Sequence, residues 1–178
     1  EPLLKNEILF HDLKSLNYFM IICSAIFFLG FLDDKYNLKA NLKFLILSII
    51  ILILLLVDFN LIINDIRFSF IDKNFILDKV DFLFTIFCFL VFINAFNMFD
   101  GINLQSALYS LLIFTCILFL YSDSFFIKIL IICILGFTYL NFKNKSFLGD
   151  SGSLLLSFVI GYLFIKLYHQ VVRNILDK

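Results

Sequence analysis

Long, nearly uninterrupted apolar runs constrain this chain more than any other feature of its sequence. One stretch, residues 49–57, is apolar at every position. Of the 178 residues, 62% are apolar, and at about 20 apolar residues per crossing this suffices for five or six membrane-spanning helices. A soluble globular domain would need more polar and charged surface. The sequence therefore predicts an all-α integral membrane protein.

The lengths of these runs define six candidate spans: 16–32, 44–63, 82–99, 104–121, 125–140 and 154–168. Strands of a transmembrane barrel would alternate polar and apolar residues, which these runs do not do. Four cysteines lie inside the runs without C-x-x-C spacing, so we expect packing residues and no disulfide or metal site: Cys23, Cys88, Cys116 and Cys133. We treat residues 1–178 as a single membrane domain.

The connection between the second and third spans has a different pattern. Apolar and polar residues alternate over 65–70, and a polar stretch at 72–74 precedes apolar residues 75–77. This pattern predicts a short β-hairpin near 64–80 at the membrane surface. The alternative is an amphipathic loop lying in the membrane interface.

Six consecutive crossings assign the connections to two faces. Connections 33–43, 97–103 and 141–153 fall on one face, which we call the motif face, and the hairpin and both chain ends fall on the other. Basic residues are about as numerous on both faces, so charge leaves the orientation open. The formal net charge is zero, and nothing in the charge balance points to nucleic acid as a partner.

Four carboxylates lie at helix ends on the motif face: Asp33, Asp34, Asp100 and Asp150. Adjacent acids at a helix end are often only solvated loop residues. Three acidic clusters on one face favour a shared site, because carboxylates are hard oxygen ligands. Mg²⁺ typically takes one or two of them and completes its shell with phosphates and waters.

Amides and small residues accompany these acids. Asn94 and Asn97 are three residues apart, on a helical face that ends at Asp100, and must bond either a neighbouring helix or a ligand. Segment 149–153 can form a helix N-terminus directed at an anion, with Asp150 as a metal ligand. Alternatively, Asp150 or Ser151 only caps that helix.

Three lysines recur every four residues at the start of the second span: Lys35, Lys39 and Lys43. They could steer a phosphorylated ligand or contact lipid headgroups. We favour headgroups for Lys43 and leave the other two open.

Segments 29–38, 94–103 and 147–157 contain an aspartate pair, N-x-x-N-x-x-D-G and G-D-S-G-S. In this order they resemble the polyprenyl-phosphate N-acetylhexosamine-1-phosphate transferases. That family includes phospho-N-acetylmuramoyl-pentapeptide transferase and the undecaprenyl-phosphate GlcNAc-1-phosphate transferase of O-antigen synthesis, and the segments look closer to the O-antigen branch. The resemblance places the motif face in the cytoplasm of a bacterial plasma membrane, with the hairpin outside.

The resemblance also implies a reaction: a sugar-1-phosphate passes from a UDP-N-acetylhexosamine to undecaprenyl phosphate, with release of UMP and dependence on Mg²⁺ or Mn²⁺. By motif position, Asp33 would activate the lipid phosphate, Asp34 would be its catalytic partner and a metal ligand, and Asp150 would be the main metal ligand. Asp100 would be a third catalytic residue on the nucleotide side, with Asn103 near the uracil. The implied substrate-binding residues are Asn94, Asn97, Asn103, Lys35 and Ser151.

The chain departs from the family's pattern in two ways. The family often continues D-G-I-N with Gly-Leu-Ala, whereas this chain has Leu104-Gln105-Ser106. The family also has further spans at both ends and a late histidine-rich loop, so we expect a central fragment whose uncovered helices favour a homodimer. The competing interpretations are a noncatalytic remnant of the family and an ion-coupled transporter with acids at mid-membrane depth.

Overall fold

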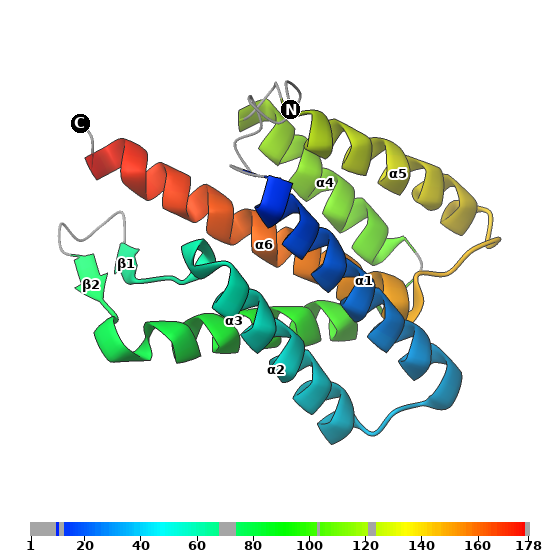
Figure 1. The fold of residues 1–178 in the computed structure, drawn as a ribbon. Helices are drawn as coiled ribbons and strands as arrows, with labels where there is room; N and C mark the ends of the chain where they lie inside the picture. Colours follow the sequence, from blue (N-terminus) through cyan, green and yellow to red (C-terminus); the bar gives the residue numbers. More distant parts are fainter. Residues whose placement is uncertain (1–9, 11–12, 68–73, 103, 121–123, 177–178) are drawn as a thin grey trace.

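The computed structural model describes residue 10 and residues 13–67, 74–102, 104–120 and 124–176. Within these residues the chain forms six α-helices and one small sheet (Figure 1). The helices are α1 (Leu13–Tyr36), α2 (Ala40–Val57), α3 (Asp81–Phe99), α4 (Gln105–Leu120), α5 (Phe125–Phe142) and α6 (Gly149–Leu176). The predicted helical membrane fold is confirmed. Five helices are long and apolar enough to cross a membrane, and α4 is apolar but only 16 residues long.

The predicted hairpin is present as a two-stranded antiparallel sheet. Strand β1 (Asp65–Arg67) pairs with β2 (Asn74–Ile76), with Ile66 opposite Phe75; the tip, 68–73, lies outside the described residues. The Tyr168 hydroxyl on α6 donates to the Asp65 carbonyl at 2.8 Å and accepts from the Arg67 amide at 3.1 Å. The sheet is therefore anchored to α6, on the opposite side of the molecule from the α1–α2 and α5–α6 connections (Figure 1).

The core of the bundle is built around α6. Half of the residues in its candidate span are buried, compared with 17–28% in the other four spans. Figure 1 shows α6 crossing behind α1. Aromatic rings from both α1 and α3 pack against rings of α6. The rings of Phe19 and Tyr162 lie 4.7 Å apart, and those of Phe89 and Phe158 lie 6.0 Å apart. Since lipid is as apolar as these side chains, close packing rather than exclusion of water holds such helices together.

A buried ion pair fixes the end of α2 to α6. Asp58 follows α2, accepts a hydrogen bond from the Asn60 amide, and lies 3.1 Å from the Lys166 ammonium. Only 6% of the Asp58 side chain and 10% of the Lys166 side chain are exposed. The ammonium also lies 5.4 Å from the centre of the Tyr162 ring. This pair was not predicted from the sequence.

The turn before α4 contains a strained residue. Leu104 has a φ of 70°, a left-handed conformation that costs a residue with a Cβ about 1–2 kcal/mol. Its amide donates to the Asn141 side chain at 2.7 Å, which holds the turn in place. Leu104 stands where the resembled family often has glycine, the residue that adopts this conformation freely.

We predict that Lys166→Met lowers the free energy of unfolding by about 3 kcal/mol, because it leaves the Asp58 carboxylate buried without its cation. Denaturation in mixed micelles would measure this. The double variant Lys166→Met/Asp58→Asn should recover most of the loss. Equal losses in the single and double variants would contradict the role assigned to the pair.

We predict that Leu104→Gly raises the free energy of unfolding by about 0.5–1 kcal/mol, since the relief of left-handed strain exceeds the added chain entropy of glycine. The matched control is Leu112→Gly within α4, where the same change should lower the free energy of unfolding by about 1 kcal/mol. The same denaturation assay shows whether each substitution raises or lowers the free energy of unfolding.

Candidate active site

The ends of three helices meet at one side of the bundle and bring the aspartate pair next to the start of α6. Asp33 and Asp34 occupy the last turn of α1. The two carboxylate oxygens of Asp34 accept hydrogen bonds from the backbone amides of Asp150 and Ser151, at 2.8 and 3.1 Å. Residues more than a hundred positions apart are thereby joined directly.

Two glycines make this approach of α1 and α6 sterically feasible. A Cβ on Gly30 would lie 2.3 Å from the Ser151 Cα atom. Gly149 has a φ of 64°, and a Cβ there would lie 2.9 Å from an Asp34 carboxylate oxygen.

A lysine lies between the two acids that the sequence pointed to most strongly. The Lys43 ammonium is 2.5 Å from the Asp33 carboxylate and 3.4 Å from that of Asp150. Asp33 also accepts a hydrogen bond from the Leu38 amide at 2.9 Å. Lys43 was expected to contact lipid headgroups, and this expectation is wrong: the short α1–α2 connection turns the first turn of α2 back over the acids. Only 12% of the Lys43 side chain is exposed.

The other expected side chains have different environments. Asn97 accepts a hydrogen bond from the Ser153 hydroxyl, which joins α3 to α6. Asn94 instead donates to the Leu90 carbonyl of its own helix at 2.7 Å. The Lys35 ammonium lies over the Tyr36 ring at 5.2 Å. Asn103 lies outside the described residues.

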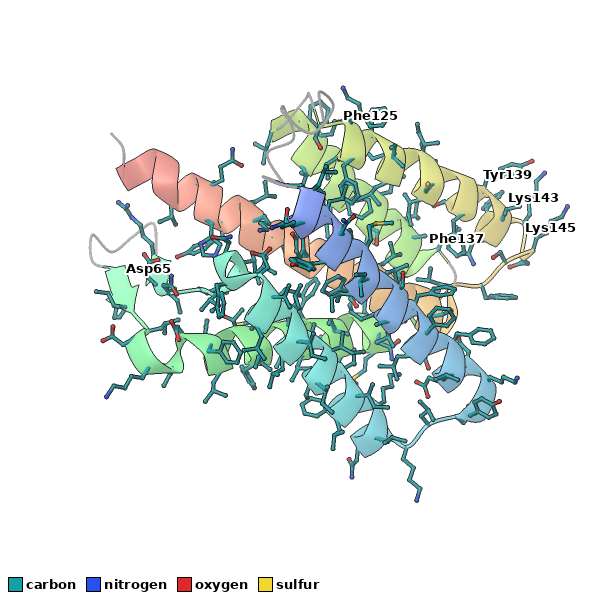
Figure 2. The ribbon with its side chains drawn as sticks, viewed as in Figure 1. Asp65, Phe125, Phe137, Tyr139, Lys143 and Lys145 are labelled. Carbon is teal, nitrogen blue, oxygen red and sulfur yellow. The ribbon has the colours of Figure 1, made fainter. Side chains whose placement is uncertain are left out.

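A cavity of about 310 Å³ opens beside these groups. Its polar lining comes from all three motif segments and from the end of α5: Asp34, Asn97, Asp100, Asp150 and Asn141. Its apolar lining includes Phe137 of α5, labelled in Figure 2, and Phe147 of the following connection. Burial raises the pKa of the Asp100 carboxyl above its ordinary value.

Asn141, at the end of α5, is a structural residue of the site that the sequence analysis missed. It is buried, its amide nitrogen donates to the Ser146 carbonyl, and its oxygen accepts from the Leu104 amide, both at 2.7 Å. It therefore ties the α3–α4 connection to the α5–α6 connection. Tyr139 lies near the end of α5, and Lys143 and Lys145 lie in the connection that follows (Figure 2). The sequence signal that could have pointed to this role was a single asparagine at the end of an apolar run.

The oxygen donors present suit a hard divalent cation. Among the residues that the structure describes, no three His, Cys, Asp or Glu side chains cluster closely enough to hold a metal ion by themselves. Asp33 and Asp150 do converge on one cationic group, which shows that the two carboxylates can share a positive charge. Mg²⁺ commonly takes one or two carboxylates and fills its remaining positions with phosphate oxygens and waters.

Comparison with known proteins gives consistent results. A family model described as glycosyl transferase family 4 matches residues 16–168. The undecaprenyl-phosphate alpha-N-acetylglucosaminyl 1-phosphate transferase of Salmonella typhi is 25% identical over 162 residues, which cover 85% of this chain and 44% of that protein. The probable undecaprenyl-phosphate N-acetylglucosaminyl 1-phosphate transferase of Bacillus subtilis (strain 168) is 33% identical over 152 residues, which cover 80% of this chain and 42% of that protein.

The chain spans less than half the length of these curated relatives. The family match nevertheless covers most of the chain and includes all three motif segments. In the structure these segments meet at one site. The chain therefore belongs to glycosyl transferase family 4.

Proposed function

We propose that this chain carries the reaction site of an enzyme that transfers N-acetylhexosamine-1-phosphate from a UDP-sugar to undecaprenyl phosphate. The observation that carries the proposal is the convergence of Asp33 and Asp150 on the Lys43 ammonium beside the cavity. Family membership and the names of the relatives support the substrate class. The pathway proposed is synthesis of an O-antigen-like envelope polysaccharide.

The reaction joins two anions, so the main requirements are charge neutralisation and alignment. An oxygen of the lipid phosphate forms a bond to the β-phosphorus of the UDP-sugar. The bond from that phosphorus to the bridging oxygen breaks, and UMP leaves with this oxygen. The products are a lipid diphosphate sugar and UMP, so atoms and charge balance.

Each group in the site has a proposed part in this chemistry. Asp33 and Asp150 would hold Mg²⁺, or Mn²⁺, which supplies positive charge to the phosphates when bound. Lys43 adds a fixed positive charge next to the position of the acceptor phosphate. Asp100 and Asn97, which line the cavity, would bind the nucleotide, with Asn103 near the uracil.

The location of the acids favours an enzyme over an ion-coupled transporter. A transporter predicts acids at mid-membrane depth on interrupted helices. Here the acids lie in the last turn of α1, directly after α3 and in the first turn of α6, and each of these helices is continuous. We further propose that this end of the bundle faces the cytoplasm of a bacterial plasma membrane, where nucleotide sugars are available.

We predict that Asp33→Asn and Asp150→Asn each lower UMP release at least 100-fold, because each removes a carboxylate that would hold the cation that neutralises the reacting phosphates. The assay uses purified protein with UDP-GlcNAc and undecaprenyl phosphate, with added Mg²⁺ or with EDTA. Asp78→Asn is the matched control, an exposed acid beside the hairpin. Unchanged activity in both site variants would overturn the proposal, and a wild-type chain without UMP release would favour the noncatalytic remnant.

We predict that Lys43→Gln lowers UMP release by about 100-fold, because the site then loses its fixed positive charge. Lys39→Gln, one helical turn away and exposed, should change activity less than threefold. Similar small effects of both substitutions would contradict the part proposed for Lys43 in the reaction and leave it a structural partner of Asp33 and Asp150.

A further inference from the structure

The first amides of α6 obtain their hydrogen-bond acceptor from a distant helix. The first four amides of any helix lack partners within the helix, and a side chain just before it usually supplies one. The residue before α6 is Leu148, which has no polar side chain. Asp34 of α1 fills this role, accepting from the amides of Asp150 and Ser151. Its negative charge also suits the positive end of the helix dipole.

Gly30 lies four residues before Asp34, on the same face of α1. Its missing side chain lets the α1 backbone approach α6 so closely that a Cβ would be 2.6 Å from the Ser151 nitrogen and 2.7 Å from the Asp150 carbonyl oxygen. Both are backbone atoms, which cannot move aside as the end of a flexible side chain can. Gly30 and Asp34 thus form one contact with the first turn of α6, which we call the α1–α6 clamp.

The clamp includes the immediate chain neighbours of the proposed metal-binding carboxylates. Asp33 adjoins Asp34 in α1, and Asp150 is itself one of the residues whose amide the clamp binds. Any separation of α1 and α6 would pull Asp33 and Asp150 away from their shared ammonium, which now lies 2.5 and 3.4 Å from them. The geometry of the acid pair therefore depends on the clamp.

We infer that Asp34 is a positioning residue: with Gly30, it holds the Asp33 and Asp150 carboxylates at the spacing the reaction needs, and it is not itself a metal ligand. The inference rests on the proposed function for what the spacing serves. The clamp itself rests only on the hydrogen bonds and the backbone contact. It assigns Asp34 a role different from the catalytic and metal-binding one expected by resemblance.

The first test compares Asp34→Asn with Asp34→Ala. Asparagine can keep one of the two hydrogen bonds from the α6 amides with its amide oxygen, but it lacks the charge of a good Mg²⁺ ligand. We expect Asp34→Ala to lower the melting temperature without metal, and to weaken Mn²⁺ binding, measured by electron paramagnetic resonance, at least tenfold. Asp34→Asn should stay within about threefold of wild type in Mn²⁺ binding. Equal weakening by both substitutions would overturn the inference, since a lost ligand is not restored by asparagine.

The second test is a double-mutant cycle between Gly30→Ala and Asp34→Ala. Both changes break the same contact, so the double variant should lose no more melting temperature, in the absence of metal, than the worse single variant. Gly136→Ala is the control, because a Cβ there meets no atom within 4 Å. If the double variant instead loses the sum of the two single losses of melting temperature, the clamp is overturned. If Gly30→Ala does not fold, the Asp34 comparison still decides.

The outcomes separate this inference from the proposed function. Coupling between Gly30 and Asp34 in the metal-free protein supports the clamp even if UMP is never released. Conversely, additive losses together with inactive Asp33→Asn and Asp150→Asn variants would remove the clamp and leave the transferase proposal intact.

Discussion

Backbone groups at helix ends need partners, and in a membrane bundle the protein must supply most of them. The start of α6 illustrates how strongly this need shapes the site. Its first amides are met by a carboxylate from α1, and this is sterically feasible because Gly30 and Gly149 carry no side chain in the gap. The most buried of the candidate spans is thus fixed at the end where the acids lie. The buried Asp58–Lys166 pair and the Tyr168 hydrogen bonds fix its other half to α2 and the sheet.

The charges that gather at this end do not cancel. Asp33 and Asp150 carry two negative charges against the single positive charge of Lys43, so the group favours a further cation. Asp34 and Asp100 add further carboxylates at the same end, and a divalent ion would offset part of this negative charge and supply positive charge to phosphates. Since charges interact more strongly where water is partly excluded, the low exposure of Asp33 and Lys43 increases both preferences. A group of this kind is suited to binding first a cation and then two anionic substrates.

Much of the fold could be read from the sequence, because its signals are local. Apolar length predicted the helices, and alternation predicted the sheet, whose strands pair as expected. Counting crossings predicted that the motif segments share one face, and the structure brings them into contact there. The partners of individual side chains did not follow. A lysine at the start of a membrane helix can reach lipid or protein equally well, and only the path of the α1–α2 connection decides this for Lys43. Asp58 and Lys166 are 108 residues apart, and no local pattern links them. Asn94 bonds its own helix, which a polar position in an apolar run does not reveal.

The described length of α4 has a consequence for how the cavity meets the membrane surface. Sixteen residues extend about 24 Å, less than the roughly 30 Å hydrocarbon thickness of a typical bilayer. A helix too short for its bilayer draws the membrane surface inward around it. Leu104 and Ala107, just before α4 and in its first turn, line the cavity. Thinning of the bilayer around α4 would therefore bring water to the mouth of the cavity at a depth that a flat bilayer would cover with lipid.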